Sequence, residues 1–428
     1  MHNLPTATKK RSPITWVPSV YFGMGLPYVA LSLVSVIMFT DLGIGKEEVT
    51  FWTSLLVLPW SLKPLFSLCM ELFGTKRQYV FLTECISALM FGCICFILPL
   101  PSFFVYAIAL MGVLAISGSM HDIAGDGIYM KELSHEQQGQ YAGWQGAFYN
   151  LAKILTNGGL VYLAGVLAKT HGLQTAWIII MGICAAIMLS LSLYHLFILP
   201  REEAKPKKST EQAMIELYTV VFSFFRKQNI WLYLIFIFLY RLAEGLTMKV
   251  APIFLKDNIL SGGIGLSNET YGVIYGTAGT VAFIVGSILS GYYIAHFGLK
   301  RVLFSLVCIF NIPFAVYLLF AIFQPQGLGW LATGIIFEYF SYGFGFVGIT
   351  LFMMQQIAPG PYQMAHYAFA NSLMNLSVMI PGMISGWLVG KLGYQSFFIL
   401  VMVVTLPAIL MAARLPFVHI VHKEQEAA

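Results

Sequence analysis

A short segment occurs twice in the sequence: residues 67–77 read SLCMELFGTKR and residues 291–301 read GYYIAHFGLKR. Each copy ends an apolar stretch with a glycine, one further residue and a basic pair. A second repeat lies further along each half, GLQTAWII at 172–179 and GYQSFFIL at 393–400. Because both repeats keep their direction and order, the chain is expected to contain two halves of similar fold.

The composition indicates that both halves lie in a membrane. Hydrophobic residues make up 58% of the 428 positions, charged residues only 10%, and the mean hydropathy is +0.78. An ordinary soluble domain has roughly 25% charged residues. The net charge of +5 comes from basic residues scattered in short loops, which argues against nucleic acid as a partner. The sequence therefore predicts a polytopic, all-α membrane protein.

Twelve apolar segments are long enough to cross a bilayer core of about 30 Å, which takes roughly 20 helical residues. The first six are 14–40, 49–70, 79–98, 102–131, 139–168 and 174–199. The second six are 229–256, 269–294, 301–323, 328–358, 363–390 and 394–418.

A polar stretch at 200–228 separates the two sets of six. It contains charges and Pro206, followed by an amphipathic segment expected to form a helix on the membrane surface. The apolar positions of that segment are Met214, Leu217, Val221, Phe224 and Phe225. We therefore expect a first six-helix bundle at 1–199, a cytoplasmic linker at 200–228 and a second six-helix bundle at 229–428.

The basic residues predict the orientation of the chain. With both termini inside, 16 lysines and arginines fall on the cytoplasmic side and four on the outer side. This asymmetry satisfies the positive-inside rule. The remaining four, Lys63, Lys153, Arg241 and Lys249, lie within spans. The apolar stretch near the N-terminus is longer than the core of a signal peptide, so it is expected to be a retained span.

Several kinds of chemistry have no support in the sequence. The six cysteines lie in or beside apolar segments, without the paired spacing of a zinc site or a disulfide framework. Phosphate-binding loops and dinucleotide fingerprints are also missing. We therefore expect no metal and no cofactor.

Motifs in the first half carry a family resemblance. LPWSLKPLFSLCMELFGTKRQ, at 58–78, resembles the P-x-SLK-x-LW/F segment of AmpG-type muropeptide permeases and the related acetyl-CoA transporters, within the major facilitator superfamily. SMHDIAGDGIYMKEL, at 119–133, with the following GQYAGWQGAFYNLAKILTNGG, is similar to the QDIA-x-D segment and the glycine-rich fifth span of that family.

The second half adds LYRLAEGLT at 239–247, which resembles the seventh-span K-L-G-D-A-x-x-x-L-T of the family. FEYFSYGFGFVGITLFMMQQ, at 337–356, resembles its tenth-span E-N-x-x-G-G-M-G. The chain departs from the family pattern at several positions that bear on the cavity and the loop motif. These are Glu71 for Asp, Ala295 in the second loop copy, Arg241 and Glu244 for Lys and Asp, and the bulky Tyr342 and Phe344.

The resemblance implies twelve transmembrane helices in two pseudo-symmetric six-helix bundles. It also implies a small-molecule substrate, transport by alternating access and location in the inner membrane. By position it nominates Lys63, Asp122, Asp126, Arg241, Glu244 and Glu338 as functional residues.

Asp122 and Asp126 lie one turn apart on the fourth span, with Asp122 roughly 13 Å from its cytoplasmic end at 1.5 Å per residue. A carboxylate inside a span is costly and usually faces the protein interior. Both acids are therefore candidate proton carriers, and Asp126 or Asp122 could instead form a bracing ion pair with Lys63. Glu84, early in the third span, is expected at the membrane interface.

Arg241 and Glu244 are three residues apart near the middle of the seventh span, where they can form an intrahelical pair. Arg241 could instead clamp a carboxylate or phosphate and leave Glu244 to exchange protons. Glu338 is expected to line the cavity from the tenth span. The loop motif and its second copy suggest gating or structural ion pairs for Glu71, Lys76, Arg77, Lys300 and Arg301. Lys63, near the inner end of the second span, is expected to form a structural ion pair.

Amides, aromatic rings and one lysine suit a sugar-like solute, because hydroxyl groups need donors and acceptors while an apolar ring face stacks on aromatics. Interhelical hydrogen bonding explains the same amides equally well. With Arg241, the candidate substrate-binding residues are Lys153, Gln145, Asn150, Tyr149, Asn371, Asn375 and Tyr240.

These observations favour a proton-coupled importer of a muropeptide or amino-sugar fragment, working as a monomer in contact with membrane lipid. Residue chemistry alone reaches only a proton-linked carrier of a polar solute. The alternatives are a proton-driven carrier of a sugar, an acyl-coenzyme compound or an exported molecule. A membrane enzyme or sensor would need a nucleophile and base or a sizeable soluble domain, which the sequence does not show.

Overall fold

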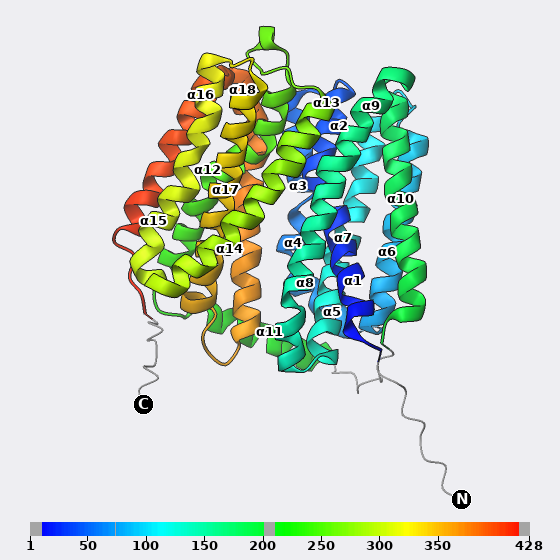
Figure 1. The fold of residues 1–428 in the computed structure, drawn as a ribbon. Helices are drawn as coiled ribbons and strands as arrows, with labels where there is room; N and C mark the ends of the chain where they lie inside the picture. The colour runs from blue at the N-terminus through cyan, green and yellow to red at the C-terminus, as the bar shows by residue number, and fades with distance from the viewer. Residues whose placement is uncertain (1–10, 73, 201–209, 419–428) are drawn as a thin grey trace, which may run out of the picture.

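The computed structural model describes residues 11–72, 74–200 and 210–418, and these form helices and no strands. The helices run side by side as two bundles (Figure 1). We call the end that holds α11 and the start of α1 the near end. The opposite end, which holds the connections 42–45 and 257–267, is the far end.

The first half contains six crossings, of which the first, second and fifth are irregular. Their bounds are α1 Val17–Val29, η2 Ala30–Val34 and α2 Ser35–Asp41; α3 Lys46–Leu55, α4 Leu58–Ser61 and α5 Lys63–Leu72; α6 Lys76–Ile97; α7 Phe103–Glu132; α8 His135–Lys153, η3 Ile154–Leu160 and α9 Val161–His171; and α10 Leu173–Ile198. The segments η2 and η3 are π-helical turns.

The second half repeats this order. Its bounds are α12 Ile230–Lys256; α13 Asn268–Tyr271, η5 Gly272–Ala278 and α14 Gly279–Phe297; α15 Leu299–Asn311, η6 Ile312–Phe314 and α16 Ala315–Phe323; α17 Leu328–Phe352 and η7 Met353–Ile357; and α18 Gln363–Ala412. The last of these holds two crossings, because Gly393 takes a positive φ of 72° and turns the chain back.

Ten helical stretches among the described residues are long and apolar enough to cross a membrane. The second crossing adds an eleventh, because its break into α3, α4 and α5 leaves no single helix long enough to qualify. The turn at Gly393 divides α18 and brings the total to twelve, as predicted. The segment expected at 49–70 is confirmed as a crossing, but it is interrupted by turns at Leu56–Val57 and at Leu62.

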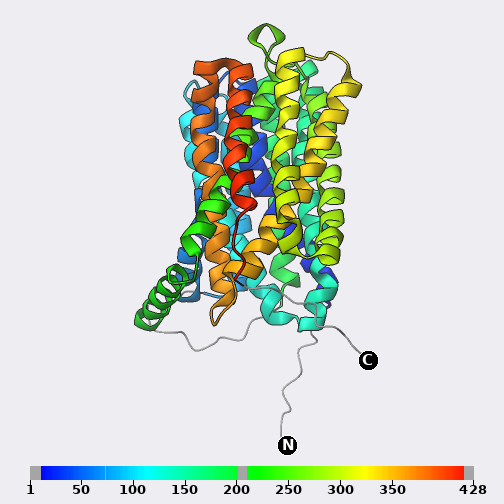
Figure 2. The same cartoon turned by 90° about the vertical axis from the view of Figure 1, so that its left-hand side faces the viewer.

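The segment between the bundles contains α11, Thr210–Phe225, as the amphipathic pattern predicts. It lies at the near end, at an angle to the crossings (Figure 2). Phe224 is fully buried, and its ring lies 5.8 Å from that of Phe369. The preceding part of the expected linker, 201–209, lies outside the described residues.

The two halves meet at helix crossings where glycine lets two backbones approach. A Cβ on Gly276 of η5 would lie 2.3 Å from the backbone oxygen of Asn157 in η3. A Cβ on Gly386 of α18 would lie 2.4 Å from the backbone oxygen of Lys46 in α3. In a membrane the hydrophobic effect does not drive helices together. Small residues at such crossings allow the close van der Waals packing that does.

Candidate functional site

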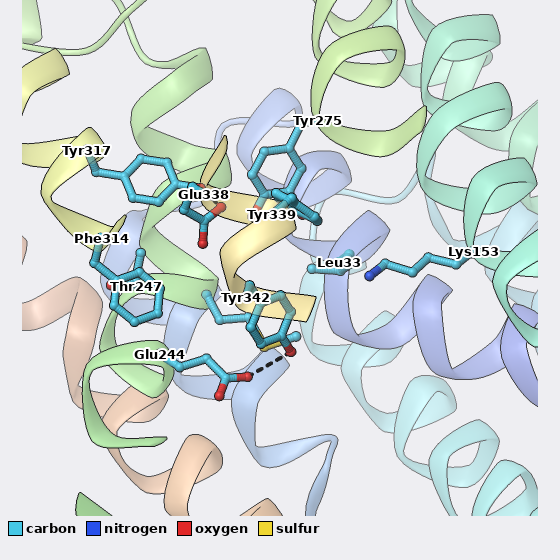
Figure 3. Close-up of a pocket in the computed structure, with 11 residues that line it drawn as sticks. Leu33, Lys153, Glu244, Thr247, Tyr275, Phe314, Tyr317, Glu338, Tyr339 and Tyr342 are labelled. Carbon is cyan, nitrogen blue, oxygen red and sulfur yellow. Dashed lines mark hydrogen bonds between the residues drawn. The ribbon is translucent and has the colours of Figure 1, made fainter. Parts of the chain in front are cut away.

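A pocket lies at the junction of the two halves (Figure 3). Leu33 of η2 and Lys153 of α8 line it from the first half. Most of its wall comes from the second half, which contributes residues of α12, η5, η6, α16 and α17, including four tyrosines. The pocket therefore combines ionisable groups and aromatic rings at the place where relative motion of the bundles would open or close it.

Lys153 is the charged residue that reaches the pocket from the first half. Its ammonium nitrogen lies 4.9 Å from the ring centre of Phe283 and 5.5 Å from that of Tyr339, both in the second half. Among the described residues no carboxylate forms an ion pair with it. Its ammonium group thus lies against aromatic faces of the second half.

Arg241 and Glu244 form the intrahelical pair that their spacing predicts. Arg241 Nε donates to Glu244 Oε2 at 2.6 Å, and Arg241 Nη2 donates to Oε1. The hydroxyl of Tyr342 donates to the same Oε1 at 2.9 Å, as the dashed line in Figure 3 shows. The carboxylate of Glu244 thus faces the pocket while the guanidinium is already occupied.

Glu338 also lines the pocket, from the tenth crossing as expected. It is 5% exposed and accepts a hydrogen bond of 3.1 Å from the hydroxyl of Tyr317. In Figure 3 its carboxylate lies among Tyr317, Tyr275 and Tyr339, above Glu244.

Asp122 lies in the first half and accepts two hydrogen bonds on one oxygen. Lys63 Nζ donates to Asp122 Oδ2 at 2.9 Å, and the indole nitrogen of Trp60 donates to it at 2.8 Å. The other oxygen, Oδ1, is buried without a hydrogen-bond partner. Of the two acids that could pair with Lys63, the structure therefore selects Asp122.

Asp126 belongs to a separate chain of hydrogen bonds that joins three helices. Gln145 Nε2 donates to the hydroxyl of Tyr21 at 2.6 Å, and that hydroxyl donates to Asp126 Oδ1 at 2.8 Å. The amide of Gln145 is therefore engaged within the first half, which is one of the two roles that the sequence left open.

The other predicted substrate residues are scattered. Tyr240 is fully buried and donates to the backbone oxygen of Gly345 at 2.7 Å, away from the pocket. Asn150 donates to Gly146 O of its own helix at 2.8 Å. Tyr149 is half-buried beside Gly25, and Asn371 and Asn375 are half-buried on α18.

The loop-motif residues lie at the near end. Arg77 donates to the backbone oxygen of Leu196, and Lys76 lies 3.4 Å from Gly127 O. Lys300 and Arg301 are exposed at the start of α15. The side chain of Glu71 lies outside the described part of the chain.

A buried cluster in the first half corrects the expectation for Glu84. This residue is fully buried rather than interfacial. Its Oε1 lies 3.0 Å from Nε2 of His121 and 2.8 Å from Nδ1 of His195. The signal in the sequence that could have indicated this cluster is His121, an ionisable residue inside the fourth span next to Asp122.

Two reciprocal ion pairs join the halves at the far end, and sequence reasoning missed them. Asp41, which ends the first crossing, pairs with Lys256 of the second half. Asp257, which follows the seventh crossing, pairs with Lys46 of the first half. We call these four residues the far-end latch.

Each aspartate of the latch is also held by an aromatic residue of the sixth crossing of its own half. Trp177 Nε1 donates to Asp41 at 3.0 Å, and the hydroxyl of Tyr394 donates to Asp257 at 2.9 Å. Asn268 adds a third donor to Asp41 at 2.6 Å. Each acid is held on its own bundle, while its lysine partner belongs to the other bundle. The ion pairs of the latch therefore form only when the bundles approach at this end.

Further polar contacts connect the bundles in the far half of the molecule. Lys169 pairs with Glu269, and Lys249 donates to two backbone oxygens of the first half. The backbone N–H of Gly386 donates to the hydroxyl of Thr50. The described structure is therefore closed at the far end.

The sequence model of the Major Facilitator Superfamily matches residues 19–359. The chain belongs to this superfamily. It is accordingly a multi-pass membrane protein of a class that transports small molecules and does not catalyse reactions on them.

Relatives within the superfamily are distant but cover most of the chain. The anhydromuropeptide permease of Escherichia coli K12 is 23% identical over 395 residues, which is 91% of this chain and 77% of the relative. An uncharacterised protein of Haemophilus influenzae is 24% identical over 91% of both chains. A putative transporter AmpG 1 of Rickettsia bellii is 22% identical over 87% of this chain and 92% of the relative.

Solved structures of the superfamily share the fold. A mutant of the nucleoside transporter NupG aligns with a TM-score of 0.72 at 12% identity, over 94% of this chain and 98% of that one. A D-xylose–proton symporter aligns with a TM-score of 0.69 at 11% identity, over 94% and 97%. These likenesses support the twelve-crossing, two-bundle architecture of this superfamily member.

Proposed function

We propose that the protein is a proton-coupled importer of an anhydromuropeptide or a related amino-sugar fragment. The observation that carries the proposal is the pocket at the bundle junction, where Lys153 of one half faces Glu244 and Glu338 of the other. The permease relative, named for anhydromuropeptide, supplies the solute class.

The pocket suits such a solute chemically. A muropeptide carries carboxylates, which an ammonium group without an acidic partner can bind. Its sugar rings have hydroxyls and apolar faces, which tyrosine hydroxyls and rings can bind. Lys153, Tyr275, Tyr339 and Tyr342 provide these groups.

Proton coupling is assigned to acids on both sides of the junction. Glu244 and Glu338 face the pocket, while Asp122 has one buried oxygen without a hydrogen-bond donor. A carboxyl group in such a site can bind a proton in one conformation and release it when its surroundings change. Asp126 would contribute through its link to Tyr21.

The positive-inside rule places the near end, and both termini, in the cytoplasm of a cell whose inner membrane holds the protein. On this assignment the far end is the outer side, and the described state is closed to the outside. Alternating access would proceed by separating the bundles at the far-end latch and closing them at the near end.

The test is uptake into sealed vesicles with an imposed pH gradient, comparing labelled anhydromuropeptide with simple sugars. We expect concentrative uptake of the muropeptide that collapses when a protonophore is added. Accumulation of a sugar without the muropeptide would replace the proposed substrate, and accumulation insensitive to the gradient would remove proton coupling.

A further inference from the structure

Lys249 lies in α12, between the pocket and the far-end latch, and is only 3% exposed. Its ammonium nitrogen donates to two backbone oxygens of the first half, Ser32 O at 2.5 Å and Thr53 O at 3.1 Å. Within the part of the chain that the structure describes, no carboxylate forms an ion pair with it. Both of its acceptors are thus backbone carbonyls of the opposite bundle.

The carbonyl of Thr53 lacks its usual helical donor because the second crossing breaks nearby. In a regular helix the N–H of Val57 would donate to it. Here the N–H of Val57 donates to Ser54 O at 3.0 Å, in a tighter turn. A backbone oxygen without a donor is costly inside a membrane protein, and Lys249 supplies the donor.

The carbonyl of Ser32 lies in η2, the π-helical turn of the first crossing. Such wide turns displace carbonyls from the regular i to i+4 hydrogen bonds and occur often at functional positions. The side-chain oxygens of Ser32 and Ser54 are buried without partners, so no hydroxyl replaces the ammonium group at these carbonyls. Lys249 therefore supplies the donor that Thr53 O lacks and also donates to Ser32 O in the irregular turn of the first crossing.

We propose that Lys249 is a positioning residue of the transport cycle, which caps the broken first and second crossings only while the far end is closed. Opening that end draws α12 away from the first bundle, so the ammonium group leaves both carbonyls and water replaces it. The far-end closed state is thereby stabilised only when α12 lies close enough to the two irregular turns for Lys249 to reach both carbonyls. The inference rests on the alternating access of the proposed function but not on its substrate.

Position along α12 gives Lys249 a connecting role. Glu244 of the pocket lies five residues before it and Lys256 of the latch seven residues after it. At 1.5 Å per residue these separations are about 7.5 Å and 10 Å along the helix. A solute that shifts α12 at the pocket would also shift the cap and the latch.

The experiment measures distances across the far end in the full-length protein in lipid nanodiscs, without solute. Spin labels are placed at Thr170 of the first half and Leu260 of the second, which are both exposed. We expect Lys249→Met to raise the ratio of long to short distances about tenfold or more, since the closed state alone then buries the Thr53 carbonyl without a donor. Lys249→Arg, which keeps a cation with several donors, should stay close to wild type.

Lys391→Met is the matched control, because it removes an exposed lysine at the same end. A second label pair at Leu260 and Trp330, within one half, verifies that the bundle is folded. If Lys249→Met fails that check, Lys249→Gln is measured in its place, since its shorter side chain also loses the contacts.

Wild-type distances in the folded Lys249 variant, or an equal shift in Lys391→Met, would overturn the inference. Absence of muropeptide uptake would overturn the proposed substrate and leave these distances unaffected, so the two failures are distinguishable.

Discussion

At the scale of single residues, Asp122 has the arrangement expected of a switchable proton site. Lys63 and Trp60 hold one carboxylate oxygen, and the other is buried with no donor. The sequence predicted that Asp122 lies inside the fourth span, but it could not decide between Asp122 and Asp126 as the partner of Lys63. That choice depends on how the broken second crossing aligns with α7, which no spacing along the chain encodes.

Replacing Asp122 with Asn should reduce the accumulation driven by a pH gradient about tenfold or more, because an amide cannot carry the proton. Equilibration of solute without a gradient should persist. Proteoliposome uptake with and without the gradient measures both, with Glu136→Gln at an exposed position as the control. Wild-type accumulation by Asp122→Asn would exclude this acid as the proton carrier.

Lys153→Met should weaken binding of an anionic solute by about tenfold or more, because the pocket then lacks the ammonium group that faces the solute. Lys153→Arg retains the charge and the contacts with aromatic faces, and it should bind better than Lys153→Met. Competition against labelled muropeptide measures the affinities, and an uncharged sugar serves as the control ligand. Equal affinities of the Met and Arg variants would show that charge at this position does not matter.

At the scale of elements, the two halves contact each other through ion pairs and through close backbone approaches at glycines. Asp41 and Lys256 are 9% and 8% exposed, so their pair is largely shielded from solvent. Lys169, which pairs with Glu269, is 73% exposed. Removing one member of a buried pair costs about 3–5 kcal/mol, whereas a pair with a solvent-exposed member is screened by water and contributes little.

Lys256→Met should therefore open the far end much more than Lys169→Met. A cysteine introduced at Tyr275 in a background without other cysteines reports the difference, by its rate of reaction with an impermeant thiol reagent added from the far side. We expect a several-fold faster reaction for Lys256→Met and little change for Lys169→Met. Similar rates in both variants would show that the latch does not hold this end closed.

Gly276→Ala should impair transport, because the added Cβ would lie 2.3 Å from the backbone oxygen of Asn157 and keep η5 from η3. Gly291→Ala is the matched control in the same crossing, where a Cβ meets no atom within 4 Å. Uptake normalised to protein amount should fall strongly in the first variant and stay near wild type in the second. Full activity of Gly276→Ala would contradict the proposed close approach.

At the scale of the whole molecule, the repeat and the hydropathy of the sequence predict twelve crossings and two halves, because both depend on local composition. The breaks near Leu56 and Leu62 were not predicted, although Pro59 and Pro64 mark the segment. The latch could not be predicted either, since Asp41 and Lys256 are 215 residues apart and meet only when the bundles pack. Local sequence therefore predicts the two halves, whereas the pocket and the latch form only where the halves pack against each other.

We propose that each solute molecule crosses the junction pocket together with protons. The most direct test is proton flux into proteoliposomes that contain a pH-sensitive dye, on addition of anhydromuropeptide without any imposed gradient. We expect internal acidification that follows muropeptide uptake and disappears in Asp122→Asn. Muropeptide uptake at an unchanged internal pH would contradict this proposal.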